Sequence, residues 1–173
     1  YYQRPDAGHL DYDPSATLLQ GWAGRLALNK QSGRNLLNAA VGYVSPGFEI
    51  NDLGFLYRSD VINTSLCLGR RWSEPGRIFR SQSLWATSYK VWDTSGRPDQ
   101  YGAGFFYWGQ LANYWRLDGM VFHNPERNSL RQTRGGPVMR LPAHQEGRLT
   151  VSTDSRNTWR ASLTAGGSRD DGG

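Results

Sequence analysis

The chain has 173 residues, a net charge of +5 at pH 7 and 13% aromatic residues, which suits one folded domain and argues against a disordered segment. Its single cysteine, Cys67, excludes an internal disulfide and a cysteine-based zinc site. No apolar run approaches the roughly 20 residues of a transmembrane helix. The basic residues are interspersed with acids, so we expect no nucleic-acid partner. Because Tyr1 is not a methionine and no leader precedes it, we expect residues 1–173 to be a single segment cut from, or processed out of, a longer protein.

The first predicted elements form a hairpin. Residues 19–30 alternate with period two, so that Trp22 and Leu26 share one face while Arg25 lies on the other. Residues 35–44 resume the alternation after a short turn, which is typical of two antiparallel strands.

Two further strands are predicted over residues 60–72 and 78–92, separated by a Pro-Gly turn. The alternation in the first of them puts Leu66 and Leu68 on one face and Cys67 on the other. In the strand predicted over residues 78–92, Trp85 shares a face with Phe79.

The most aromatic stretch, residues 101–123, is either one long strand or two short ones. Residues 124–144 are polar, basic and punctuated by proline and glycine, and they predict a long loop. A last hairpin pairs residues 147–154 with 158–167. No stretch has helical periodicity with caps.

These elements predict an all-β fold: an antiparallel up-and-down transmembrane β-barrel, or a segment of one, with about seven or eight strands and alternating short turns and long loops. A soluble β-sandwich is the alternative, because its packed core and wet surface would also alternate. A membrane barrel would bring one set of residues into contact with lipid: Trp22, Leu26, Leu28, Leu66, Leu68 and Trp85.

Two patterns favour the membrane barrel. The less apolar face carries residues that suit an aqueous lumen: Arg25, Asn29, Arg71, Arg80 and Gln82. Aromatic residues near strand ends suit an interfacial girdle: Tyr43, Trp72, Tyr89, Trp92 and Tyr101.

Three stretches carry a resemblance to a known family: residues 1–33, residues 43–63, which contain "SPGFEINDLGF", and "TRGGPVM" at 133–139. Together they resemble uncharacterised bacterial outer-membrane β-barrels in which the barrel follows a carbohydrate-binding module of the family-nine type. The resemblance implies an internal barrel segment, a bacterial outer-membrane location and strand edges covered by the rest of the parent barrel or another subunit. It implies no catalytic residues.

The acidic stretch raises the question of a metal site, since Glu49, Asp52 and Asp60 are carboxylates within a short span. Their spacing does not match the twelve-residue calcium loop. The interpretation we favour is structural, with Phe48, Ile50, Leu53 and Phe55 packing on the sheet while Asn51 and Asp52 bond the turn backbone.

A basic loop is the second candidate site. Its arginines surround a Gly-Gly-Pro turn and suit an anionic sugar, a phosphate or lipopolysaccharide: Arg127, Arg131, Arg134 and Arg140. Ion pairing with acids such as Asp118 and Glu126 is the equal alternative.

The sequence contains only weak indications of sugar binding by aromatic residues and of metal binding by histidines. An aromatic segment suits stacking on sugar rings, but lipid-facing and girdle aromatic side chains explain it better: Phe105, Phe106, Tyr107, Trp108, Tyr114 and Trp115. His9, His123 and His144 lie far apart in the chain, so we expect no histidine-based metal site and no cofactor.

The function we expect is non-enzymatic: passage or recognition of saccharide-like or anionic solutes by an outer-membrane, porin-like barrel. The alternatives are a soluble carbohydrate-binding module and, third, an envelope hydrolase. No nucleophile or acid pair is assembled by the sequence.

Overall fold

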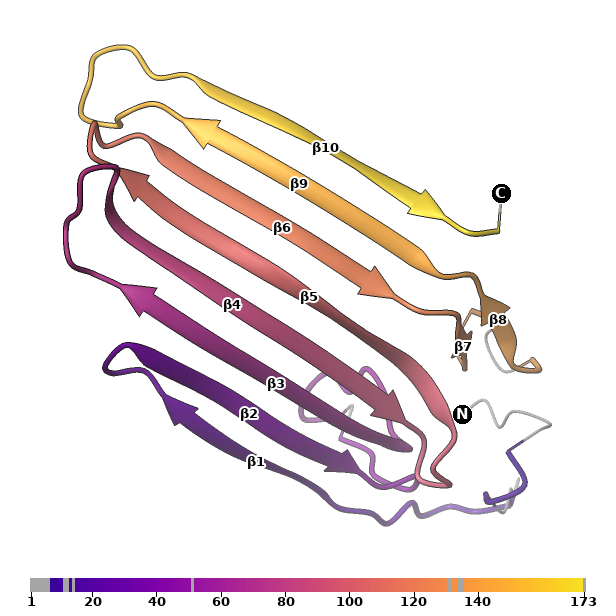
Figure 1. Ribbon diagram of the computed structural model, residues 1–173. Coiled ribbons are helices and arrows are strands. Elements are labelled where there is room, and N and C mark those ends of the chain that lie inside the picture. Colours follow the sequence, from indigo (N-terminus) through magenta and orange to yellow (C-terminus); the bar gives the residue numbers. More distant parts are fainter. Residues whose placement is uncertain are drawn as a thin grey trace.

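The structure is a computed structural model that describes residues 7–10, 13, 15–50, 52–130, 132–133 and 136–172. Its main feature is one eight-stranded antiparallel sheet in the order β1-β2-β3-β4-β5-β6-β9-β10 (Figure 1). The strands are β1 (Ala23–Lys30), β2 (Asn35–Val44), β3 (Val61–Trp72), β4 (Phe79–Trp92), β5 (Pro98–Leu111), β6 (Arg116–Asn124), β9 (His144–Ser152) and β10 (Ser162–Asp170).

The strands run up and down in chain order, as predicted from strands joined one after another by turns and loops. Between β6 and β9 the chain forms a separate two-stranded ribbon of β7 (Arg127–Ser129) and β8 (Met139–Leu141). The all-β antiparallel prediction is therefore confirmed. Within the described residues, no helix is long and apolar enough to span a membrane.

The two ends of the sheet differ (Figure 1). The short-turn end has the connections 31–34, 73–78, 112–115 and 153–161. The opposite end, here the long-loop end, has the connections 45–60, 93–97 and 125–143. The described N-terminal residues 7–10 also lie at the long-loop end, where His9 contacts Asp60.

The two faces of the sheet also differ. Register aligns Leu26 with Val41, Leu37 with Leu68 and Leu84 with Tyr107, so apolar residues of successive strands share one face. We call this the apolar face, and ten of its side chains are 41% to 74% exposed: Leu26, Leu28, Val41, Leu66, Leu68, Leu84, Phe105, Val121, Leu149 and Leu163.

The opposite face is here called the mixed face, because it combines charged, small and aromatic residues. Its members include Arg25, Asn63, Ser65, Cys67, Trp85, Phe106, Asp118, Glu146 and Arg148.

Trp85 and Gln82 lie on the face opposite to the one predicted. Trp85 pairs with Gly69 on the mixed face, whereas the sequence placed it with Leu66 and Leu68. A Cβ atom on Gly69 would lie 2.7 Å from the Trp85 ring, so the glycine makes room for the indole across the strand. Gln82, expected among the lumen residues, pairs with Trp72 and lies on the apolar face.

The aromatic stretch forms two strands, β5 and β6, joined by a turn in which the Tyr114 amide donates to the Leu111 carbonyl. Tyr114 has a φ of 68°, which is costly for an aromatic residue. The guanidinium carbons of Arg80 and Arg156 lie 4.1 and 3.3 Å from the centroid of its ring. These cation–π contacts offset part of the strain and join the start of β4 to the connections 112–115 and 153–161.

The sheet has little side-chain core. The accessible surface is 12078 Å², whereas a compact protein of this mass exposes about 8,500 Å². Among the described residues the buried hydrophobic ones are Ala7, Leu36, Val61 and Leu130, and all but Leu36 lie at the long-loop end. Both faces of the sheet therefore remain accessible, and the packed part of the molecule is the long-loop end.

The acidic loop 45–60 differs from the expected packing. Leu53 is 94% exposed and Phe55 is 85% exposed. The Ile50 carbonyl accepts hydrogen bonds from the amides of Leu53 and Gly54, at 2.8 and 2.9 Å, and this tight turn directs Leu53 away from the sheet. The predicted packing of Leu53 and Phe55 is wrong, and Asn51 lies outside the described residues.

Candidate functional site

The long-loop end concentrates buried polar side chains. Three connections and the N-terminal segment meet there. The buried polar residues at this end of the sheet are Ser45, Asp93, Asp99, Asn124 and Ser129. Buried polar groups are stable only when they are hydrogen-bonded or paired with charge. Their partners therefore define what this end of the molecule can do.

Asp93 begins the β4–β5 connection and is fully buried. One of its oxygens, Oδ1, accepts hydrogen bonds from the Ser95 amide at 3.1 Å, the Ser95 hydroxyl at 2.6 Å and the Arg97 amide at 2.9 Å. The sequence Asp-Thr-Ser-Gly favours this arrangement, because an aspartate side chain readily caps the backbone two residues on and Gly96 adopts the required positive φ of 87°.

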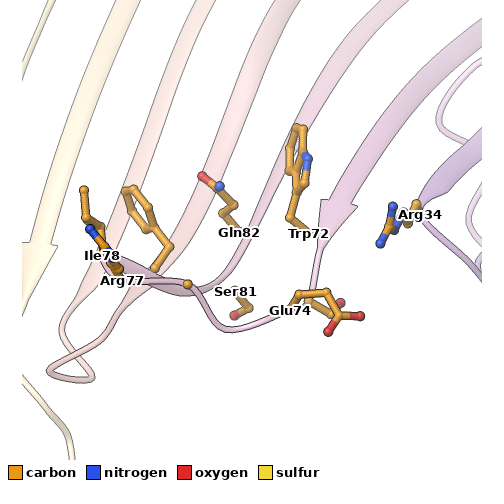
Figure 2. Close-up of a pocket in the computed structure, with 10 residues that line it drawn as sticks. Arg34, Trp72, Glu74, Arg77, Ile78, Ser81 and Gln82 are labelled. Carbon is orange, nitrogen blue, oxygen red and sulfur yellow. The ribbon is translucent and has the colours of Figure 1, made fainter.

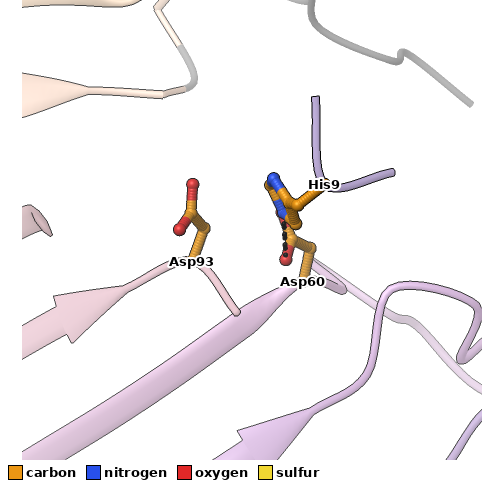
Figure 3. Close-up of side chains that lie close together, drawn as sticks. All are labelled: His9, Asp60 and Asp93. Atoms are coloured by element: carbon orange, nitrogen blue, oxygen red, sulfur yellow. Dashed lines mark hydrogen bonds and ion pairs between the residues drawn. The ribbon is translucent and has the colours of Figure 1, made fainter. Parts of the chain in front are cut away.

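Asp60 ends the loop before β3 and has a φ of 54°. Its Oδ1 accepts hydrogen bonds from the Thr94 amide at 3.0 Å and the Thr94 hydroxyl at 2.6 Å, which link this loop to the β4–β5 connection. The His9 Nε2 atom lies 3.2 Å from both oxygens of Asp60. One ligand atom from each of His9, Asp60 and Asp93 lies within 4.8 Å of the others (Figure 3).

Asp99 forms a second buried centre. Its carboxylate is fully buried, pairs with the guanidinium of Arg58 and accepts a hydrogen bond from the Leu130 amide at 3.0 Å. Asp99 thereby joins the 45–60 loop, the start of β5 and the 125–143 connection. Nearby, the Tyr89 hydroxyl donates to Asn124 Oδ1 at 2.8 Å.

The acidic candidates are separated by the structure. Asp60 groups with His9 and Asp93, and among the described residues neither Glu49 nor Asp52 belongs to that group. Asp52 is exposed. The sequence missed His9 because 51 residues separate it from Asp60, and no local pattern links them. Asp93 was also missed, although the Asp-Thr-Ser-Gly turn that begins there is a local signal that could have pointed to it.

Two of the arginine candidates, Arg127 and Arg140, lie on the β7–β8 ribbon. The Arg127 guanidinium donates to the Pro142 carbonyl at 3.4 Å, and the exposed side chain of Arg140 forms an ion pair with Glu126. The predicted alternative of pairing with Glu126 is therefore confirmed for Arg140. Arg131 and Arg134 lie outside the described residues.

An open pocket of about 460 Å³ lies at the short-turn end, away from the buried carboxylates of Asp93 and Asp99. Figure 2 shows Trp72 and Gln82 on neighbouring strands, with Glu74 and Arg77 on the connection that borders them. In the connection 153–161, at the same end of the sheet, hydrogen bonds from the side chain and amide of Arg156 lower the pKa of Asp154 below its ordinary value.

Comparison with known proteins gives one match. The family model described as Domain of unknown function (DUF5916) matches residues 8–171. No curated protein and no solved structure matches the chain.

Proposed function

We propose, for a chain that belongs to the DUF5916 family, that the eight-stranded sheet is part of the wall of a bacterial outer-membrane β-barrel. In this proposal the apolar face contacts lipid and the mixed face lines an aqueous lumen. The protein acts without catalysis, in passage or recognition of saccharide-like or anionic solutes.

The distribution of charge on the apolar face carries the proposal. Among the described strand residues, the charged side chains of this face are Lys30, Arg70, Lys90 and Arg169, and each lies within two residues of a strand end. The middle of all eight strands presents apolar or small residues instead. A lipid-facing surface requires charged side chains to lie near the strand ends, because a lysine or arginine at the bilayer centre costs about 2–4 kcal/mol.

Aromatic residues lie near both ends of the strands on the apolar face. At the short-turn end the guanidinium of Arg70 lies 5.5 Å from the Trp72 ring, and at the long-loop end the ammonium of Lys90 lies 4.8 Å from the Trp92 ring. Such pairs suit the membrane–water interface, where an indole and a cation both find polar neighbours. Tyr89, expected in this girdle, faces the mixed side instead.

The edges of the sheet support a larger assembly. Strand β1 pairs only with β2, and β10 only with β9, within the described residues. Unpaired backbone groups cost several kcal/mol each in hydrocarbon, so further strands of the same barrel or of another subunit would cover these edges in a membrane.

The mixed face gives the proposed lumen its chemistry. Four arginines lie on it, on strands across the sheet: Arg25, Arg71, Arg116 and Arg148. Asp118, Glu146 and Asp170 accompany them, so the charged side chains of this face have a small excess of positive charge, which favours anionic solutes.

Cell fractionation of the full-length protein tests the proposal. We expect it in the outer-membrane fraction, extracted by detergent and not by high salt or alkaline carbonate. Its migration on a detergent gel should shift on boiling, because a closed barrel resists detergent until it is heated. Recovery in the aqueous fraction without such a shift would contradict the proposal.

A further inference from the structure

We propose that His9, Asp60 and Asp93 form a binding site for a divalent transition-metal ion, with zinc the best fit, and that this ion fastens the N-terminal segment to two loops of the long-loop end. The three residues come from the segment 7–10, the loop 45–60 and the connection 93–97. The proposal concerns this cluster alone and does not depend on lipid contact by the sheet.

The geometry of the His9–Asp60 contact suits a shared ion. Charge-assisted hydrogen bonds between nitrogen and a carboxylate measure about 2.7–2.9 Å. The His9 Nε2 atom is instead 3.2 Å from both Asp60 oxygens. Two ligand atoms that each bind zinc at about 2.1 Å, separated by an angle of about 100°, lie about 3.2 Å apart. The contact lies at the upper end of the hydrogen-bond range and also matches the spacing of two ligands on one ion.

The two carboxylates are held in place before any ion binds. Thr94 donates twice to Oδ1 of Asp60, and Ser95 donates twice to Oδ1 of Asp93. Such outer contacts orient metal ligands and reduce the conformational entropy lost on binding. Because the ligand oxygens of the two aspartates lie within 4.8 Å of the third ligand and of each other, a dication between them would also remove the repulsion of like charges.

The donor set selects the class of metal. One imidazole nitrogen and two carboxylate oxygens suit zinc and neighbouring transition metals, whereas calcium and magnesium prefer oxygen ligands throughout. Three protein ligands leave one position of a tetrahedral ion for water.

A bound ion would order the segment 7–10, which precedes β1. Ala7 is 1% exposed, and the Leu10 amide donates to the Ala7 carbonyl at 3.0 Å, so this segment forms a compact turn against the long-loop end. His9 supplies its ligand from this turn. An ion would make the docking of the segment depend on metal concentration.

Zinc titration of the full-length protein, prepared without a polyhistidine tag, tests the site by competition with a chromophoric chelator. We expect one zinc bound per chain, at least tenfold weaker binding in His9→Gln and in Asp60→Asn, and unchanged binding in His144→Gln. Asparagine tolerates the positive φ at position 60, so Asp60→Asn keeps the turn. His144 is the matched control, because its Nδ1 lies 2.6 Å from Asp170 but it belongs to no cluster of three ligands among the described residues.

Cobalt substitution gives a second readout. Co²⁺ at this site should produce visible absorption of four-coordinate cobalt, and the band should disappear in His9→Gln but not in His144→Gln. Equal zinc binding by the native protein and His9→Gln, or an equal loss in His144→Gln, would overturn the proposal. Fractionation of the protein would be unaffected by either result, so the metal site and the membrane proposal fail separately.

Discussion

Leu66→Arg is expected to destabilise the folded protein in lipid by about 2–4 kcal/mol, whereas Asn63→Arg is expected to cost less than about 1 kcal/mol. Both residues are exposed and lie on β3, but Leu66 is on the apolar face and Asn63 is on the mixed face. The cost arises because an arginine at Leu66 would place its charge in hydrocarbon. At Asn63 the same side chain would meet water.

Urea unfolding of the full-length protein in lipid vesicles measures this difference, with outer-membrane recovery as a second readout. Leu66 is 41% exposed, so an aqueous protein of this shape would accept arginine at either position. Equal stability of the two variants would therefore show that the apolar face does not meet lipid.

Arg58→Ala should be the most damaging single change at the long-loop end, at about 3–5 kcal/mol, because it leaves the fully buried carboxylate of Asp99 without its cation. Arg140→Ala is the matched control. Its side chain is 79% exposed and pairs with the half-exposed Glu126, and such surface pairs contribute less than about 1 kcal/mol.

Amide hydrogen exchange measures the predicted loss of local stability. The Leu130 amide donates to Asp99, so its exchange should accelerate strongly in Arg58→Ala and remain unchanged in Arg140→Ala. Similar exchange in the two variants would mean that the Arg58–Asp99 pair does not hold the 45–60 and 125–143 connections together.

The sequence predicted strands well where the two faces of a strand are chemically distinct. On β1 and β3, large apolar residues recur at every second position, and the register confirms the shared face of Leu26 and Leu66. On β4 both alternations contain large residues. Trp85 could therefore not be assigned from periodicity, and only its packing over Gly69 on the neighbouring strand places it on the mixed face.

The candidate site was less accessible to sequence reasoning. The turn beginning at Asp93 is local and carries a recognisable signal. The contact of His9 with Asp60 and that of Arg58 with Asp99 span 51 and 41 residues. Such contacts depend on which connections meet at one end of the sheet, and this is fixed by strand order and register. The exposure of Leu53 likewise follows from the tight turn at Ile50, which hydrophobicity alone could not reveal.

Adjacent positions of β3 distinguish contact of the apolar face with lipid from contact with water. A polarity-sensitive fluorophore would be attached either to Cys67, on the mixed face, or to Leu66→Cys in a Cys67→Ser background. Cysteines elsewhere in the full-length protein would be replaced. In vesicles of brominated lipid, we expect blue-shifted and quenched emission from position 66 and unquenched emission from position 67. Equal quenching at both positions, or none at either, would contradict the assignment of the apolar face to the bilayer.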